Sequence, residues 1–210
     1  LGGRPVDGRA AGLGGGALAL SLGLFASARR SRTPEERARL LVGRLVPRAV
    51  RKRVPFVRKA GAVSHPSIVR EAPAMHALHE SPALLAMFAR VTAVALDHRD
   101  PCEAHASALY TYSERGDWID WHFDECGCPP EDSFSTIIGL IDSSTGSSPS
   151  SSRLEFETRC DRDPLRRSLQ TVPGTFAFFC GTRARHRVTP LGQGEERVTF
   201  AFTYIRKGRK

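Results

Sequence analysis

The residue pattern of the chain changes after Pro101, and this change limits the possible folds more than any other feature of the sequence. From there on, short runs rich in β-branched and aromatic residues are separated by Gly, Pro, Asp and Ser. The runs cover residues 106–113, 118–123, 134–141, 153–158, 168–172, 175–180, 185–189 and 198–205. Eight short strands with turn residues between them are typical of a barrel or jelly roll. The sequence therefore predicts a mainly β domain with a double-stranded β-helix (jelly-roll) core.

Helices are expected before these strands. Apolar residues recur at helical spacing between residues 67 and 96, and Ser81-Pro82 indicates a fresh helix start within that stretch. Thr33-Pro34 begins a capping box and predicts a basic amphipathic helix that ends near residue 46. Residues 50–59, rich in Arg and Lys, are interpreted as a basic linker.

The positive charge lies almost entirely in the N-terminal part of the chain. The formal net charge is +9, but residues 1–60 hold fourteen basic and three acidic groups, whereas residues 61–210 hold seventeen and nineteen. We therefore divide the chain into a basic N-terminal extension, residues 1–60, and a folded domain, residues 61–210. Because the domain is close to neutral, composition gives no support for a nucleic-acid-binding surface.

Residues 10–28 form an apolar run of small residues, and Arg29-Arg30-Ser31-Arg32 follows it. One interpretation is a membrane anchor or signal peptide, and a second is an organelle transit peptide. The third is a leader without a targeting role. The sequence therefore leaves the location undecided between an organelle, a membrane and the cytoplasm.

Three residues in the strand region have the chemistry of a metal site. His122 and Asp124 are two residues apart in a predicted strand, so both side chains can face one metal ion. His186 opens the predicted strand 185–189, after an apolar strand and a Gly turn. Two imidazoles and one carboxylate leave three coordination positions open, which is the facial arrangement of non-haem Fe(II) sites. The alternative for the first pair is a surface His and Asp flanking a turn.

Arg197 opens the last predicted strand, eleven residues beyond His186. A planar guanidinium pairs with a carboxylate through two parallel hydrogen bonds, which a lysine cannot do. Thr199 projects to the same face and can add a hydroxyl donor. We expect Arg197 and Thr199 to bind the distal carboxylate of a dicarboxylate cosubstrate; the alternative is a solvated charge at a strand start.

Taken in order, these residues resemble the motif of the 2-oxoglutarate/Fe(II)-dependent dioxygenase superfamily, in its prolyl-hydroxylase-like and small-molecule hydroxylase branch. The matching residues are His122-x-Asp124, His186 and Arg197-x-Thr199, with Pro173-Gly174 before the strand that leads to His186. The resemblance covers residues 84–206. It implies Fe(II) on the three metal ligands, 2-oxoglutarate as cosubstrate, O₂ as oxidant and ascorbate as an optional reductant. It also implies that Tyr110 or Tyr112 contacts the cosubstrate, with strand packing as the alternative for both.

The resemblance favours hydroxylation of a C–H bond in an amino acid, a prolyl peptide or another small substrate. Some oxygenases that act on free amino acids are halogenases, which lack the metal carboxylate that Asp124 supplies here. Residues 119–125 also resemble the alkylated-nucleobase demethylases, but Thr203 and Tyr204 stand where that family has a second arginine. Residues 151–156 depart from the prolyl-hydroxylase pattern and leave the substrate entrance unassigned. A non-catalytic metal-binding or sugar-binding jelly roll is the alternative of another class, and it would not need Arg197.

Overall fold

In the described part of the chain, eleven antiparallel strands form one continuous sheet in the computed structural model of the protein. The structure describes residues 39, 43, 45, 49–54, 58–99, 106–124, 133–144, 148–158 and 165–208, all of which lie in the unit Arg32–Lys210. The strands are β1 (Val50–Val54), β2 (Arg58–Ser64), β3 (Leu96–His98), β4 (Ser107–Tyr112), β5 (Trp118–His122), β6 (Ser133–Ser143), β7 (Leu154–Thr158), β8 (Leu165–Leu169), β9 (Phe176–Cys180), β10 (Ala184–Val188) and β11 (Glu196–Arg206). The helices are α3 (His65–Glu71), α4 (Pro73–His79) and α5 (Pro82–Thr92).

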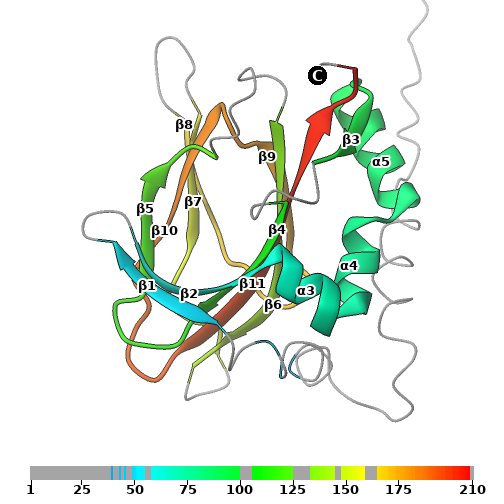
Figure 1. Cartoon of the computed structure of the whole chain (residues 1–210). Coiled ribbons are helices and arrows are strands. Elements are labelled where there is room, and N and C mark those ends of the chain that lie inside the picture. The colour runs from blue at the N-terminus through cyan, green and yellow to red at the C-terminus, as the bar shows by residue number, and fades with distance from the viewer. Residues whose placement is uncertain are drawn as a thin grey trace, which may run out of the picture. The chain divides into compact units, whose positions relative to one another are not determined.

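The sheet curls into two facing layers. Its strand order is β8-β7-β10-β5-β2-β4-β11-β6-β9, and β1 and β3 are added to β2 and β11. Figure 1 shows β5, β10, β7 and β8 on one side and β4, β11, β6 and β9 on the other, so that β2 joins the two layers. The predicted jelly-roll core is confirmed.

The three helices cover the outer face of the layer that contains β4, β11, β6 and β9 (Figure 1). Phe88 of α5 stacks on Phe178 of β9 with ring centroids 3.9 Å apart. Leu84 and Met75 belong to the same buried apolar cluster. The predicted helix start at Ser81 is confirmed, because its side chain accepts a hydrogen bond from the amide of Leu84.

The predicted linker at residues 50–59 is wrong. Residues 50–54 form β1, and residues 58–64 form β2, which pairs with both β4 and β5. The domain boundary drawn between residues 60 and 61 therefore falls within a central strand. Leu45 is also fully buried in the core, so the folded region begins earlier than expected. The linker was predicted from basic composition, but basic composition does not exclude a strand, because strands with a solvated face or edge accommodate Lys and Arg.

A second correction concerns the strand expected at residues 168–172, which is found at Leu165–Leu169. Among the described strands it pairs with β7 alone, and it carries two exposed arginines, so few of its residues are apolar. The helix expected up to residue 46 lies mostly outside the described residues, and the apolar run 10–28 lies entirely outside them. None of the helices in the described part of the chain is long and apolar enough to cross a bilayer.

Candidate metal centre

Three side chains meet at the ends of two neighbouring strands. The antiparallel register of β10 and β5 places His186 directly opposite His122, and Asp124 follows just after β5. The possible ligand atoms of the three residues all lie within 4.8 Å of one another. Each imidazole Nε2 is 3.6 Å from Oδ1 of Asp124. The structure thus brings together the three residues that the sequence predicts as metal ligands.

Backbone carbonyls orient both imidazoles. Nδ1 of His122 lies 2.7 Å from the carbonyl oxygen of Asp120, and Nδ1 of His186 lies 3.1 Å from that of Ala184. Because a carbonyl only accepts, each Nδ1 carries the proton and each Nε2 keeps its lone pair for a metal. Burial lowers the pKa of His186, and this effect prevails over the opposing effect of Asp124. A neutral imidazole is the form that binds metal.

Asp124 is held by Ser135, which the sequence analysis did not single out, and by Gly181, which it noted only as a turn residue. Ser135 of β6 donates a hydrogen bond to Oδ2, which leaves Oδ1 facing the imidazoles. The amide of Asp124 donates to the carbonyl of Gly181. A Cβ at Gly181 would lie 2.3 Å from Oγ of Ser135 and 2.9 Å from Cβ of Asp124, so only glycine permits this approach. The available sequence signals were a Gly directly after an apolar strand and a Ser at an alternate position of another.

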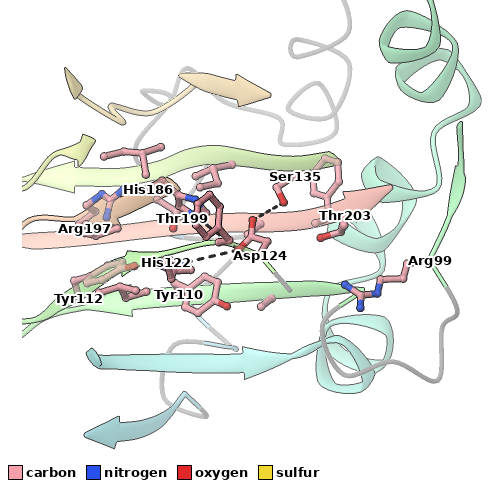
Figure 2. A pocket seen from close by; sticks show the side chains of 18 residues that line it. Arg99, Tyr110, Tyr112, His122, Asp124, Ser135, His186, Arg197, Thr199 and Thr203 are labelled. Carbon is pink, nitrogen blue, oxygen red and sulfur yellow. Dashed lines mark hydrogen bonds and ion pairs between the residues drawn. The ribbon is translucent and has the colours of Figure 1, made fainter. Parts of the chain in front are cut away.

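A cavity of about 390 Å³ contains this metal centre. Figure 2 shows Arg197 and Tyr112 on one side of the three ligands and Arg99 on the other. The apolar side chains of the lining are those of Ala108, Ile119, Phe123, Ile137, Leu154, Val188, Ala201 and Phe202. The cavity therefore offers two cationic ends, a metal-binding middle and walls that are largely apolar.

Arg197 is fully buried, with 0% of its surface exposed. Its Nε donates a hydrogen bond to Oγ1 of Thr171 at 2.7 Å, and its guanidinium carbon lies 4.9 Å from the ring centroid of Tyr112. Within the described part of the chain, Nη1 has no hydrogen-bond acceptor. A buried donor without a partner typically costs about 1–3 kcal/mol, and more when it is charged. An anion in the cavity would remove this cost.

Tyr110, Tyr112 and Thr199 also line the cavity. The register of β4 with β11 places Tyr112 opposite Arg197 and Tyr110 opposite Thr199. Burial raises the pKa of the Tyr112 hydroxyl, although the charge of Arg197 opposes this shift, so the hydroxyl stays protonated. Tyr112 packs against the arginine, whereas Tyr110 is only partly buried in the same wall. A role of either residue in cosubstrate binding stays a prediction.

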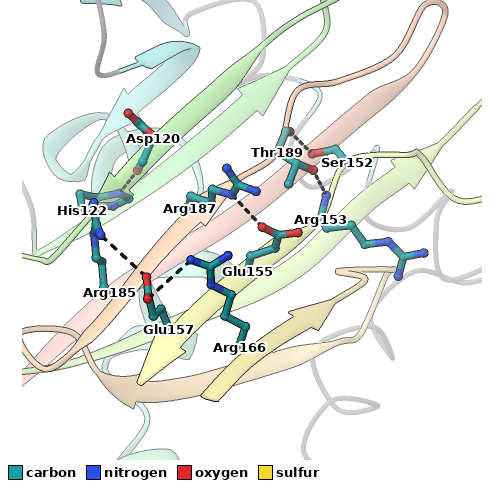
Figure 3. A network of polar contacts seen from close by, with 10 residues as sticks. All are labelled: Asp120, His122, Ser152, Arg153, Glu155, Glu157, Arg166, Arg185, Arg187 and Thr189. Carbon is teal, nitrogen blue, oxygen red and sulfur yellow. Dashed lines mark hydrogen bonds and ion pairs between the residues drawn. The ribbon is translucent and has the colours of Figure 1, made fainter. Parts of the chain in front are cut away.

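Arg185 and Arg187 flank His186 but belong to the outer face of their layer (Figure 3). Nε of Arg187 donates to Glu155 at 2.7 Å, and Nη1 of Arg185 lies 3.7 Å from Glu157. Neither arginine lines the cavity. Since alternate residues of a strand face opposite sides, the position of His186 directs both arginines outward.

No protein-family model and no curated protein sequence matches the chain. Several solved structures do. A prolyl-4-hydroxylase from Pseudomonas putida is 15% identical, with 91% of this chain and 100% of that chain covered and a TM-score of 0.58. A prolyl hydroxylase from Trichoplax adhaerens, solved with a peptide fragment of the hypoxia-inducible factor oxygen degradation domain, is 12% identical, with 90% of each chain covered and a TM-score of 0.62. A member of the 2OG-Fe(II) oxygenase family from Burkholderia pseudomallei is 14% identical, with 90% and 78% covered and a TM-score of 0.55.

The fold is that of the 2-oxoglutarate/Fe(II) oxygenases. The resemblance seen in the sequence is confirmed at this level. At identities of 12–15% the likeness concerns the fold, so the activity has to be argued from the site itself.

Proposed function

We propose that the protein is an Fe(II)- and 2-oxoglutarate-dependent dioxygenase that hydroxylates a C–H bond of a small-molecule or peptide substrate. One observation carries this proposal. A His-Asp-His cluster and a buried arginine with an unpaired donor line the same cavity. A purely structural metal site would not need a buried cation beside it.

The donor set fits Fe(II). His122 and His186 offer neutral Nε2 atoms, and Asp124 offers one carboxylate oxygen, which together form a 2-His-1-carboxylate set with open positions. When bound, Fe(II) would supply the activation of O₂ and the oxidation that protein side chains cannot perform. The presence of Asp124 favours hydroxylation over halogenation.

The buried arginine fits a dicarboxylate cosubstrate. Thr171 and Tyr112 fix the guanidinium of Arg197, so its orientation is set before the cosubstrate binds. Nη1 can then donate to a carboxylate, with the hydroxyl of Thr199 as a second donor in the same wall. A fixed donor loses little entropy on binding, which strengthens the interaction. The apolar lining keeps water away from this charge pair.

Arg99 lies in the cavity wall on the other side of the metal ligands from Arg197 (Figure 2). A guanidinium at this end favours a substrate with an anionic group, such as the carboxylate of an amino acid. The Trichoplax adhaerens enzyme was solved with a peptide fragment, and this supports a peptide as the other substrate class. In the demethylase alternative a second arginine is expected at residues 203–204. Thr203 lines the cavity instead, and Tyr204 is buried in the core.

The first experiment is the formation of succinate from 2-oxoglutarate by the full chain with Fe(II), ascorbate and O₂. We expect slow turnover without substrate, and none in Asp124→Ala. Asp97→Asn, an exposed carboxylate on β3, is the control and should keep wild-type turnover. A folded, iron-loaded protein that makes no succinate with any substrate offered would leave the non-catalytic jelly roll as the better proposal.

Free amino acids, prolyl peptides and methylated oligonucleotides are then compared as substrates. A true substrate should raise the rate and couple each succinate to one hydroxylated product. Arg99→Gln should weaken the binding of an anionic amino acid more than that of a neutral peptide. Coupling with a methylated oligonucleotide would instead support the demethylase alternative.

A further inference from the structure

Four of the seven histidines of the chain lie away from the cavity. His65 begins α3, His76 and His79 belong to α4, and His98 ends β3. Their rings are neighbours: the ring centroids are 5.7 Å apart for His65 and His76, and 5.2 Å apart for His79 and His98. Such a concentration of imidazoles suits a divalent transition metal.

His79 is the unusual member of this cluster. Only 1% of its surface is exposed, yet neither ring nitrogen makes a hydrogen bond of good geometry within the described residues, and Nδ1 has the carboxylate of Glu80 at 3.3 Å. Nδ1 of the neighbouring His76 is also buried without a partner. Buried polar atoms of side chains are nearly always hydrogen-bonded or bound to a metal, so the poorly satisfied nitrogens of these two neighbouring rings require an explanation.

We propose that His76, His79 and Glu80 form a second metal site, suited to Zn²⁺. The two histidines are three residues apart, which places them on one face of α4. Glu80 follows at the end of the helix, with Oε1 3.3 Å from Nδ1 of His79. The possible ligand atoms of the three residues lie within 4.8 Å of one another.

Two imidazoles and a carboxylate are common ligands of Zn²⁺, which is usually four-coordinate. A water molecule would complete the set. The exposed side chain of Glu80 gives the ion access from solvent. This site does not depend on the proposed oxygenase activity, because it shares no ligand with the centre in the cavity.

The position of the site indicates a structural role. The ring of His79 lies 5.3 Å from that of Phe202 and 5.7 Å from that of Tyr204, both on β11. The hydroxyl of Tyr204 donates to the carbonyl of His79 at 2.8 Å. Thr203, between them in β11, lines the cavity. A metal at α4 would therefore stabilise the packing of the helices against β11, the strand that carries Arg197.

The test counts the Zn²⁺ ions that the full chain retains after equilibrium dialysis, and measures the Tm of the same samples. We expect two ions in the wild type, because the cavity centre also accepts Zn²⁺. One ion should remain in Asp124→Ala, one in His76→Ala and none in the double variant. His76 is chosen because it is only partly buried, whereas replacing His79 would disturb the core.

Zn²⁺ at about 100 times its Kd should raise the Tm of Asp124→Ala by roughly 5–10 °C, and His76→Ala should abolish that rise. Glu80→Gln, which keeps the size of the side chain, should weaken binding at least tenfold. Glu114→Gln is the matched control, because it changes an exposed carboxylate in the loop between β4 and β5. It should leave both the ion count and the Tm unchanged.

An Asp124→Ala protein that retains no ion would overturn the proposal, as would a Zn²⁺ count and Tm rise that His76→Ala leaves unchanged. Failure of the oxygenase proposal has a different signature. If the cavity binds no metal, Asp124→Ala would keep the wild-type number of ions, while His76→Ala would lose one; if the cavity binds metal without catalysis, the ion counts stay as expected and only succinate formation is absent.

Discussion

Replacement of Arg197 tests the reasoning about the cavity most directly. The side chain is fully buried, Thr171 and Tyr112 hold it, and Nη1 has no acceptor in the described part of the chain. Arg197→Ala removes the whole guanidinium. Arg197→Lys keeps a positive charge but loses the planar fork and the bond from Nε to Thr171.

The expected loss of affinity follows from the burial of the pair. Removing one partner of a desolvated, hydrogen-bonded charge pair costs ~2–5 kcal/mol. At ~1.4 kcal/mol per tenfold, Arg197→Ala should weaken 2-oxoglutarate binding by roughly 30-fold to several thousandfold. Arg197→Lys should fall between this variant and the wild type. Thr171→Val should cause a smaller loss, because it only loosens the orientation of the guanidinium.

The assay is an anaerobic titration that follows the absorption band of the iron–2-oxoglutarate chelate. Fe(II) affinity in the absence of 2-oxoglutarate is measured beside it and should hardly change, since Arg197 is not a metal ligand. Arg185→Ala removes an arginine from the outer face and serves as the matched control. A folded Arg197→Ala protein with wild-type affinity for 2-oxoglutarate would refute the assignment.

Three further predictions follow from the same structure. Gly181→Ala should displace the carboxylate of Asp124, because the new Cβ would lie 2.9 Å from that side chain. We expect at least tenfold weaker Fe(II) binding in an iron titration. Denaturant unfolding should show a loss of ~1–3 kcal/mol in the free energy of unfolding. Changing any of the three metal ligands to Ala should abolish succinate formation while the circular dichroism spectrum stays native; turnover in any of these variants would remove that residue from the site. Deleting residues 1–60 should prevent folding, because it removes β1 and part of β2, whereas deleting residues 1–31 should leave the Tm unchanged. A stable protein after the longer deletion would show that β2 is dispensable.

The strands that carry the site could be predicted because their signals are local. Alternation and flanking turn residues located β4, β5, β9 and β10 within about two residues of their observed bounds. The i and i+2 spacing of His122 and Asp124 is likewise local, although Asp124 lies just after the end of β5. The helix start at Ser81 could also be predicted, because its capping hydrogen bond joins residues only three positions apart, Ser81 and Leu84.

The parts that could not be predicted depend on distant pairing. β2 was missed because its residues are basic or small, and its place is decided by β4 and β5, which come about fifty residues later. Ser135 on β6 and Gly181 in the turn after β9 support Asp124, and Thr171 supports Arg197 from a loop. A periodic pattern predicts which face a side chain takes, but not which neighbour it meets there.

The position of β11 also has a consequence for synthesis on the ribosome. This strand pairs with β3, β4 and β6, so it joins parts of the chain that are made much earlier. A nascent chain that stops before Glu196 lacks Arg197 and exposes the apolar edges that β11 covers. Such non-local pairing makes folding slow and leaves partly made chains prone to aggregation. We therefore expect the sheet to be completed only after β11 has been synthesised.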